Sequence, residues 1–222
     1  MGIVSISNTN RLLWLGRYTE RVYTTIRYFD KYFDQIIDSG EGVIDEFCER
    51  LGIPNCYTDG ENFVERYCFD EEDPNSIAAN LMRAYDNAVT LREEIGSEAV
   101  SYIQMAVYAL QETHGQRAPI MGMQKILDQI LAFWGITEDL IAEENVRNIM
   151  KVGKRIERMD LYCRLHAPNG DIQREAFRLT DRLKKTQLQY DREKAARLPE
   201  LVEKLPESRM QIVELVDSML GE

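Results

Sequence analysis

The sequence is poor in the residues that mark common metal, disulfide and membrane sites. Its 222 residues include two histidines and four cysteines, and no two cysteines form a C-x-x-C pair. Neither a zinc site nor a disulfide framework is therefore expected, and the spacing fits reduced thiols. No apolar run approaches the ~20 residues of a membrane span, and the N-terminus lacks the basic and apolar regions of a signal peptide. We therefore expect a cytoplasmic protein of bacterial type with no membrane partner.

Several catalytic signatures are also missing. The sequence contains no Walker loop, no G-x-S-x-G motif and no kinase motif, so it indicates none of the corresponding chemistries. A ferritin-like metal site would need Glu-x-x-His pairs, and neither Glu20 nor Glu157 is followed by such a histidine. We expect no metal site, and these residues leave the cofactor open.

Positive charge is scarce relative to negative charge. The net charge is -11, and the absence of a basic stripe argues against a nucleic-acid partner. Residues 41–73 contain eleven acids against Arg50 and Arg66, which gives this segment alone a charge of −9. Such a segment is either a solvated connector or a docking surface for a basic partner.

Helical periodicity dominates the rest of the sequence and predicts an all-α bundle of about six or seven helices. We expect one domain over residues 1–222, with 41–73 as an acidic, irregular connector. The two longest helices are predicted at 8–39 and 137–166, the first capped by Ser7 or Asn8 and the second opened by Thr137. The other expected helices of the bundle cover 73–95, 97–114, 119–135, 171–197 and part of 206–220, and two short helical pieces are expected at 43–51 and 63–69 within the connector.

One stretch occurs twice, once in each of the two longest predicted helices. Gly16-Arg17-Tyr18-Thr19-Glu20-Arg21 returns, 137 residues later, as Gly153-Lys154-Arg155-Ile156-Glu157-Arg158. Apolar positions on both sides of the motif also correspond, and Arg27 corresponds to Arg164. A glycine in a helix costs roughly 1 kcal/mol relative to alanine, so we expect another helix or a ligand to approach the backbone beside each glutamate.

Each repeated glutamate follows a core position by one residue, so it is predicted to flank the apolar stripe of its helix. If the two copies face each other, the carboxylates of Glu20 and Glu157 converge with several cations. The candidate catalytic residues are Glu20 and Glu157, and the candidate binding residues of the repeats are Arg17, Arg21, Arg27, Lys154, Arg158 and Arg164. The residues alone leave two alternatives open, a buried salt-bridge network that fixes helix register and a ligand or catalytic site.

A second candidate group lies on the helix predicted to begin with Asp73-Pro74. Asn80, Arg83 and Asn87 have the spacing of one helix face. Asn and Arg side chains on a common face suit the recognition of a carboxylate or phosphate group. The alternative is an exposed helix face, because both residue types are mostly found at surfaces.

These motifs together resemble the bacterial alpha-E domain family, a helical family named for its Glu-Arg motifs. The segments that carry the resemblance are Asn10–Arg21, Asp73–Ile77 with Asn80, Arg83, Asn87 and Arg92, Phe133–Ile136, and Gly153–Asp160. The resemblance covers about residues 3–166. The chain is a short version of a family usually nearer 300 residues, and Val100 stands where a tryptophan is common.

The resemblance implies a context rather than a reaction. Members of the family are typically encoded beside, or fused to, circularly permuted ATP-grasp proteins that look like carboxylate-amine ligases. We therefore expect an ATP-grasp-type partner and a peptide or amino-acid ligand, with the Glu/Arg cluster binding an amine, carboxylate or phosphate group. The alternative is a non-catalytic helical module that docks a partner through its acidic segment. Whether the chain is an enzyme, and whether it forms a homo-oligomer, stays open.

Overall fold

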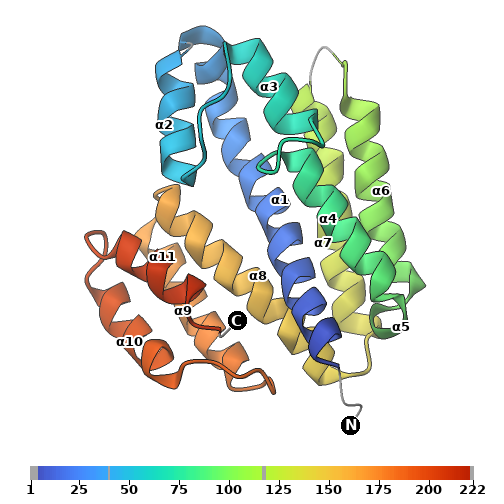
Figure 1. Cartoon of the computed structure of the whole chain (residues 1–222), viewed down its shortest axis with the longest axis vertical. Coiled ribbons are helices and arrows are strands. Elements are labelled where there is room, and N and C mark those ends of the chain that lie inside the picture. The colour runs from blue at the N-terminus through green and yellow to red at the C-terminus, as the bar shows by residue number, and fades with distance from the viewer. Residues whose placement is uncertain (1–4, 40, 117–118, 221–222) are drawn as a thin grey trace. The chain divides into compact units, whose positions relative to one another are not determined.

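The computed structural model describes residues 5–39, 41–116 and 119–220, and it confirms the all-α fold (Figure 1). The chain divides into two compact units, one formed by Met1–Glu20 with Glu143–Glu222 and the other by Arg21–Ala142. We call them the terminal unit and the central unit. The division falls within the first helix, and the expectation of one domain over 1–222 stays a prediction.

The described residues form more helices than the six or seven expected, because two predicted helices are each interrupted and the two short pieces within 41–73 are helices of their own. The helices are α1 (Ile6–Ser39), α2 (Glu41–Leu51), α3 (Gly60–Phe69), α4 (Ile77–Thr90), α5 (Arg92–Ile95), α6 (Ser97–Thr113), α7 (Pro119–Leu140), α8 (Glu144–Arg164), α9 (Asn169–Leu183), α10 (Arg192–Glu203) and α11 (Arg209–Asp217). The first begins two residues before its predicted start, and the Ser5 hydroxyl, rather than Ser7 or Asn8, accepts the Asn8 backbone N–H at 3.1 Å.

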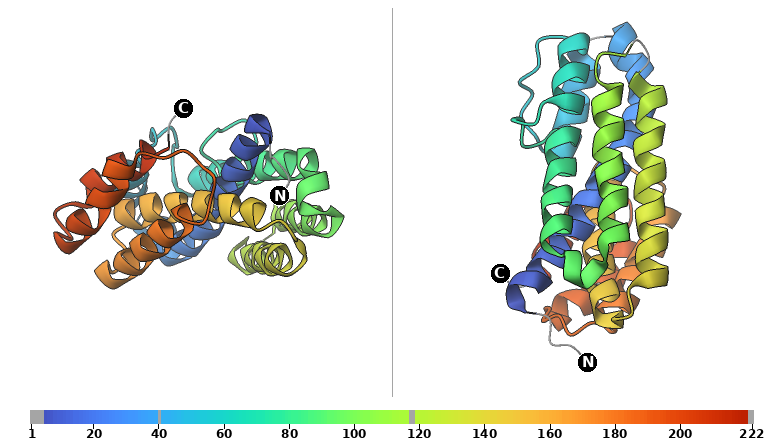
Figure 2. Two further views of the ribbon diagram at one scale, coloured as in Figure 1. Left: turned by 90° about the horizontal axis from the view of Figure 1, so that it is seen from below. Right: turned by 90° about the vertical axis from the view of Figure 1, so that its right-hand side faces the viewer.

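The central unit is a bundle in which α4, α6 and α7 lie side by side (Figure 2, right). Their facing sides bury aliphatic side chains, among them Leu81, Ile103 and Ile130. Nearer α2 and α3 the core is aromatic, with Phe47, Phe63 and Tyr67 all fully or almost fully buried. Apolar burial of this extent stabilises the unit without disulfides.

The expected helix start at Asp73-Pro74 is wrong. The backbone of Asp73 to Ser76 forms a turn, and α4 begins at Ile77 with the Ser76 hydroxyl accepting the Ala79 backbone N–H at 2.9 Å. Asp73 instead accepts hydrogen bonds from the Asn75 backbone N–H and the Tyr57 hydroxyl. Aspartate before proline is a common helix start, but here Ser76, two residues after Pro74, satisfies the first helical N–H groups.

The boundary between the seventh and eighth helices is also misplaced by sequence reasoning. Helix α7 continues through Gly135 and includes Thr137, and the helix with the second repeat begins at Glu144 rather than at 137. The predicted helix over 171–197 is two helices, α9 and α10, separated by residues 184–191. Gly135 has open space around it, so the packing of α7 on α6 carries the helix through a residue that usually ends one.

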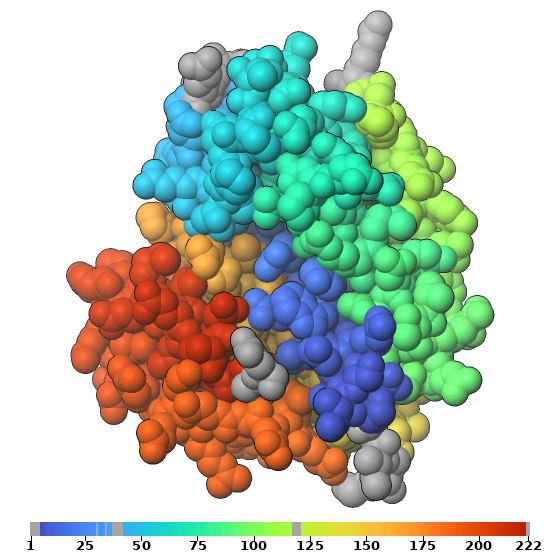
Figure 3. Space-filling view, viewed as in Figure 1, coloured from blue at the N-terminus to red at the C-terminus, as the bar shows by residue number. Residues whose placement is uncertain are grey.

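In the terminal unit, α8 packs against α9 and α11, and α10 packs against α9 and α11. The side chains of α9, α10 and α11, orange to red in Figure 3, form one continuous surface. Arg209 fastens the start of α11 to the turn after α8, because its guanidinium donates to the Ala167 carbonyl at 2.9 Å and to Asn169 Oδ1 at 2.7 Å. This unit contains both copies of the Gly-x-x-x-Glu motif.

Candidate functional site

The two repeated glycines lie where the backbones of α1 and α8 meet. A Cβ atom added at Gly16 would lie 2.1 Å from the Met150 carbonyl oxygen, and one added at Gly153 would lie 2.0 Å from the Leu13 carbonyl oxygen. Each glycine therefore contacts the backbone of the opposite copy, and no side chain fits between them. The expectation that the glycines make room for another helix is confirmed for this pair.

The close approach brings each glutamate to an arginine of the opposite copy. Arg158 donates from Nε to Glu20 Oε1 at 2.6 Å and from Nη2 to Glu20 Oε2 at 2.7 Å. Arg17 donates from Nε to Glu157 Oε2 at 2.8 Å. Both glutamates are 0% exposed, whereas the sequence predicted that they would only flank the apolar stripe. Because the paired arginines shield them, the carboxylates are tolerated at full burial.

Arg17 also makes contacts beyond the repeats. Its Nη2 lies 3.1 Å from Asp217 Oδ1 of α11, and its guanidinium carbon lies 4.7 Å from the centre of the Trp14 ring. A guanidinium held by two carboxylates and an aromatic face has little freedom left. Burial opposes the charge of Arg17, but Glu157 and Asp217 outweigh it and raise the pKa of the guanidinium.

A third buried carboxylate, Glu175 of α9, joins the network on the other side of α8. It accepts hydrogen bonds from Arg155 Nη1 at 2.5 Å and from Arg178 Nη1 at 2.7 Å. Arg158 Nη1 lies 3.7 Å from Glu175 Oε1, so Arg158 links Glu175 to Glu20. Although burial opposes its charge, these arginines lower the pKa of Glu175, and the carboxylate is therefore ionised at neutral pH.

Lys154 is the repeat's counterpart of Arg17, and its environment is less favourable to charge. Burial lowers its pKa to about 7, with Glu20 opposing the shift and Arg158 and Arg155 adding to it. Lysines with a pKa near neutrality are suited to binding or proton transfer. Arg158 differs from Lys154 in this respect, because the attraction of Glu20 outweighs burial and raises the pKa of Arg158.

The structure places the predicted residues of the repeats in different settings. One network in the terminal unit contains Arg17, Glu20, Lys154, Glu157 and Arg158. Arg164 pairs locally with Asp160 of the same helix, with Nε–Oδ distances of 2.9 and 3.0 Å. Arg21 and Arg27 lie in the central unit, where exposed Arg27 rests over the Tyr23 ring at 5.7 Å.

The second predicted group, on α4, is engaged with its own helix start. Asn80 donates from Nδ2 to the Ser76 carbonyl at 2.7 Å, and Arg83 donates from Nη1 to the Pro74 carbonyl at 2.7 Å. These bonds satisfy carbonyls of the turn before α4, which is a structural reason for both side chains. Asn87 lies one turn further along, half-buried. The role of Asn80, Arg83 and Asn87 in ligand binding stays a prediction.

Sequence reasoning missed Arg155, Glu175, Arg178 and Asp217. One signal was available for Glu175, because it lies in the apolar stripe of α9 formed by Ile172, Ala176, Leu179 and Leu183, all of them buried. An acid in such a stripe needs partners. Arg178 follows three residues later on the same face, but nothing in the sequence connects Arg155 of α8 to this helix.

The described residues contain neither a cluster of metal-ligating side chains nor a membrane-spanning helix. No group of three or more His, Cys, Asp or Glu side chains there is placed to hold a metal ion. No helix in that part of the chain combines the length and the apolar character needed to cross a membrane. The described site itself presents guanidinium, ammonium and carboxylate groups.

Comparison with known proteins gives the same family as the motifs. The model of the Alpha-E family, a predicted alpha-helical domain with a conserved ER motif, matches residues 8–211. The chain therefore belongs to the Alpha-E family. No curated protein and no solved structure gives a significant match.

Proposed function

We propose that this chain is the partner of an ATP-grasp-type carboxylate-amine ligase in the synthesis or modification of a peptide or amide. Membership of the Alpha-E family supports this partnership, because members of the family are expected to act with ATP-grasp proteins. The proposed binding role of the site rests on one network. In it Arg17, Arg155 and Arg158 each pair with a buried carboxylate. Such preoriented guanidinium groups suit the binding of a carboxylate or phosphate group.

Within this function, Glu20 and Glu157 serve as positioning residues. Both oxygens of Glu20 already accept hydrogen bonds from Arg158, so a substrate proton could reach the carboxylate only if that pair opened. For Glu20 the geometry thus favours the orientation of an arginine over proton transfer by the carboxylate. The arginines retain small exposed fractions, 13% for the side chain of Arg17 and 14% for that of Arg158, through which a ligand can be reached.

The partnership predicts that the chain stimulates ATP-dependent ligation. We expect an ATP-grasp-type partner ligase to release ADP about tenfold faster or more when the chain is added, a modest gain for groups that position a substrate. The double variant Glu20→Met with Arg158→Met removes both charges of one ion pair together, and it should lose most of the stimulation while remaining folded. ADP release without any dependence on the chain would refute the proposal.

A second candidate function is a non-catalytic module that docks a basic partner. It is favoured by the distribution of charge, because residues 21–142 contain 22 acids and nine Lys and Arg, a net charge of −13, whereas the terminal unit has a net charge of +2. Within 41–73, the acids with exposed side chains are Asp45, Glu46, Glu49, Asp59, Glu61, Glu65, Glu71 and Glu72. An acidic surface of this kind steers a basic partner towards the complex.

Neutralisation of part of this surface tests the docking role. We expect the fourfold variant Glu49→Gln, Glu61→Gln, Glu71→Gln and Glu72→Gln to bind the ATP-grasp protein roughly tenfold more weakly or worse, and with less salt dependence. A matched control neutralises four exposed glutamates elsewhere, Glu93, Glu200, Glu207 and Glu214. Equal affinities of the two fourfold variants in a titration would contradict docking through 41–73.

A further inference from the structure

The surroundings of Glu175 contain more positive than negative charge. Three guanidinium groups, from Arg155, Arg158 and Arg178, face this carboxylate. Lys154 interacts electrostatically with the same group and with Glu20. Four basic groups therefore meet two buried carboxylates. The local excess is one positive charge while Lys154 is neutral and two once it is protonated, and such an excess calls for a counter-ion in a half-buried site.

Burial disfavours the charge of two of these basic groups, and repulsion from the neighbouring arginines adds to that effect. Burial lowers the pKa of Arg155, and repulsion from Arg158 and Arg178 adds to the shift although Glu175 opposes it. Lys154 has a pKa of about 7, for which burial is again the first cause and the neighbouring arginines a further one. Both groups would hold their protons more firmly if an anion lay beside them.

One N–H donor of the Arg155 guanidinium has no hydrogen-bond acceptor. Its Nη1 binds Glu175, but its Nε is buried without a hydrogen-bond partner. A buried N–H of a guanidinium is costly to leave unpaired, and in a native protein it calls for an explanation such as an ion or a water molecule. Next to it, the side chain of Arg178 is 46% exposed, so the cluster is accessible from solvent.

We propose that Arg155, Arg178 and Lys154 form a binding site for a phosphate-type dianion. Two negative charges match the excess that is present when Lys154 is protonated, whereas a single carboxylate would then leave one positive charge uncompensated. Guanidinium groups bind tetrahedral oxyanions through several N–H groups at once, and a lysine adds a point charge. The choice of phosphate among dianions rests on the proposed function, because an ATP-dependent ligase handles phosphoryl groups.

Binding of the dianion is coupled to protonation of Lys154. The charged groups that face this lysine within its unit are Glu20 of α1, Arg155 and Arg158 of α8, and Glu175 of α9. With the site empty, Lys154 is largely neutral at pH 8, and a bound dianion raises its pKa so that it takes up a proton. Affinity for the dianion therefore falls as the pH rises from 7 to 9.

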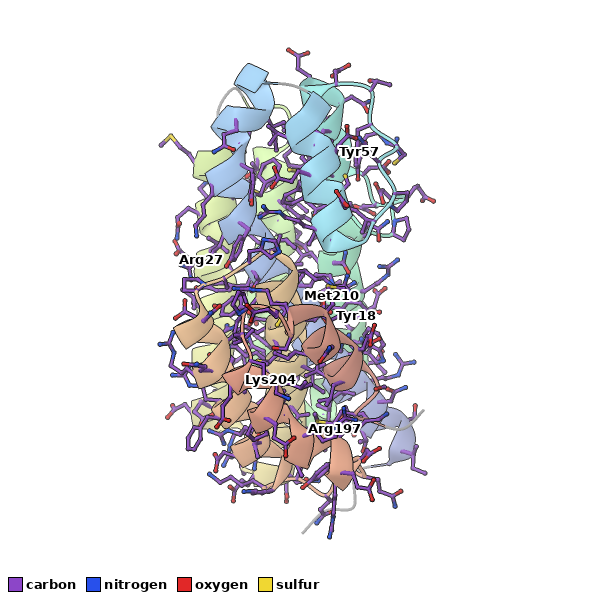
Figure 4. All side chains as sticks on the ribbon, turned by 90° about the vertical axis from the view of Figure 1, so that its left-hand side faces the viewer. Tyr18, Arg27, Tyr57, Arg197, Lys204 and Met210 are labelled. Carbon is purple, nitrogen blue, oxygen red and sulfur yellow. The ribbon has the colours of Figure 1, made fainter. Side chains whose placement is uncertain are left out.

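Calorimetric titration of the full chain with inorganic phosphate at pH 8 tests the site. We expect saturable binding and, in two buffers with different protonation enthalpies, net proton uptake. Arg155→Gln and Arg178→Gln should each weaken binding about tenfold or more, the usual consequence of losing a charge-assisted hydrogen bond. The matched control is Arg197→Gln on α10, where an exposed arginine is visible in Figure 4, and it should bind within twofold of the wild type.

Three outcomes would overturn the proposal. One is the absence of saturable binding, and another is an equal loss of affinity in Arg155→Gln, Arg178→Gln and Arg197→Gln. The third is acetate binding as tightly as phosphate, which would assign the site to a carboxylate. In Lys154→Met the proton uptake should vanish, and its persistence would remove Lys154 from the site. Since the exposed Arg178 can be replaced without loss of buried packing, the test holds even if Arg155→Gln unfolds.

These measurements need only the isolated chain. A failure to bind phosphate would leave the stimulation of the ligase to be measured by itself. A failure to stimulate the ligase would not contradict phosphate binding by the chain, so each of the two proposals can be refuted without the other.

Discussion

Alanine in place of Gly16 or Gly153 is expected to lower the free energy of unfolding by about 3 kcal/mol or more, the upper range for overpacking. The added Cβ would lie 2.1 Å or less from a backbone carbonyl oxygen of the opposite helix. Because the obstructing atom belongs to a backbone, no side-chain rotation can relieve the contact, and α1 and α8 would have to move apart. That movement would also lengthen the ion pairs beside the glycines.

A third helical glycine provides the control. Gly135 lies within α7, and a Cβ added there would meet no atom within 4 Å. Gly135→Ala should therefore leave the stability unchanged or raise it by up to about 1 kcal/mol, the difference in helix propensity. Urea denaturation of the three single variants measures both effects. Similar stabilities for Gly16→Ala and the wild type would show that the two backbones are not in close contact.

The sequence was sufficient to predict the all-α fold and a close approach to the backbone at each repeated glycine, whereas it left the contact between the two repeats conditional. Both depend on local signals, namely helical periodicity and a doubled glycine beside a doubled glutamate. The partners of the glutamates were predictable as a set but not as pairs. Arg17 and Arg158 occupy different positions in the two copies, and only the crossing geometry of α1 and α8 decides which arginine reaches which carboxylate.

The remaining differences arise where tertiary packing overrides a local signal. Gly135 and Thr137 carry stop and start signals, yet they lie within α7, which is stabilised by packing against α6. The turn before α4 is closed by Ser76 and by Asn80, although Asp73-Pro74 was the stronger sequence signal. Glu175 and Arg155 meet because α9 folds back onto α8 after a short turn, a contact that no periodicity in either helix encodes.

The effects of replacing Glu20 and Arg158 on the free energy of unfolding should depend strongly on each other, because the two residues form a buried ion pair. We expect Arg158→Met to lower the free energy of unfolding by about 3–5 kcal/mol, because it leaves the fully buried carboxylate of Glu20 without its bidentate partner. Arg164→Met removes an arginine that pairs with Asp160 within one helix, and the loss of such a pair costs only about 0.5 kcal/mol. The two variants change the same residue type in the same helix, so they separate the effect of a buried pair from that of a local one.

Replacement of both partners decides what the pair contributes. In Glu20→Met with Arg158→Met neither member of the pair is left without the other, and apolar side chains of similar length fill the space, so the stability should return to within about 1 kcal/mol of the wild type. If the double variant remains as unstable as Arg158→Met alone, the pair itself stabilises the crossing of α1 and α8. Recovery of stability without recovery of ligase stimulation would instead show that the motif is retained for what its arginines bind rather than for the fold, because a salt bridge that apolar residues can replace is not needed to hold two helices together.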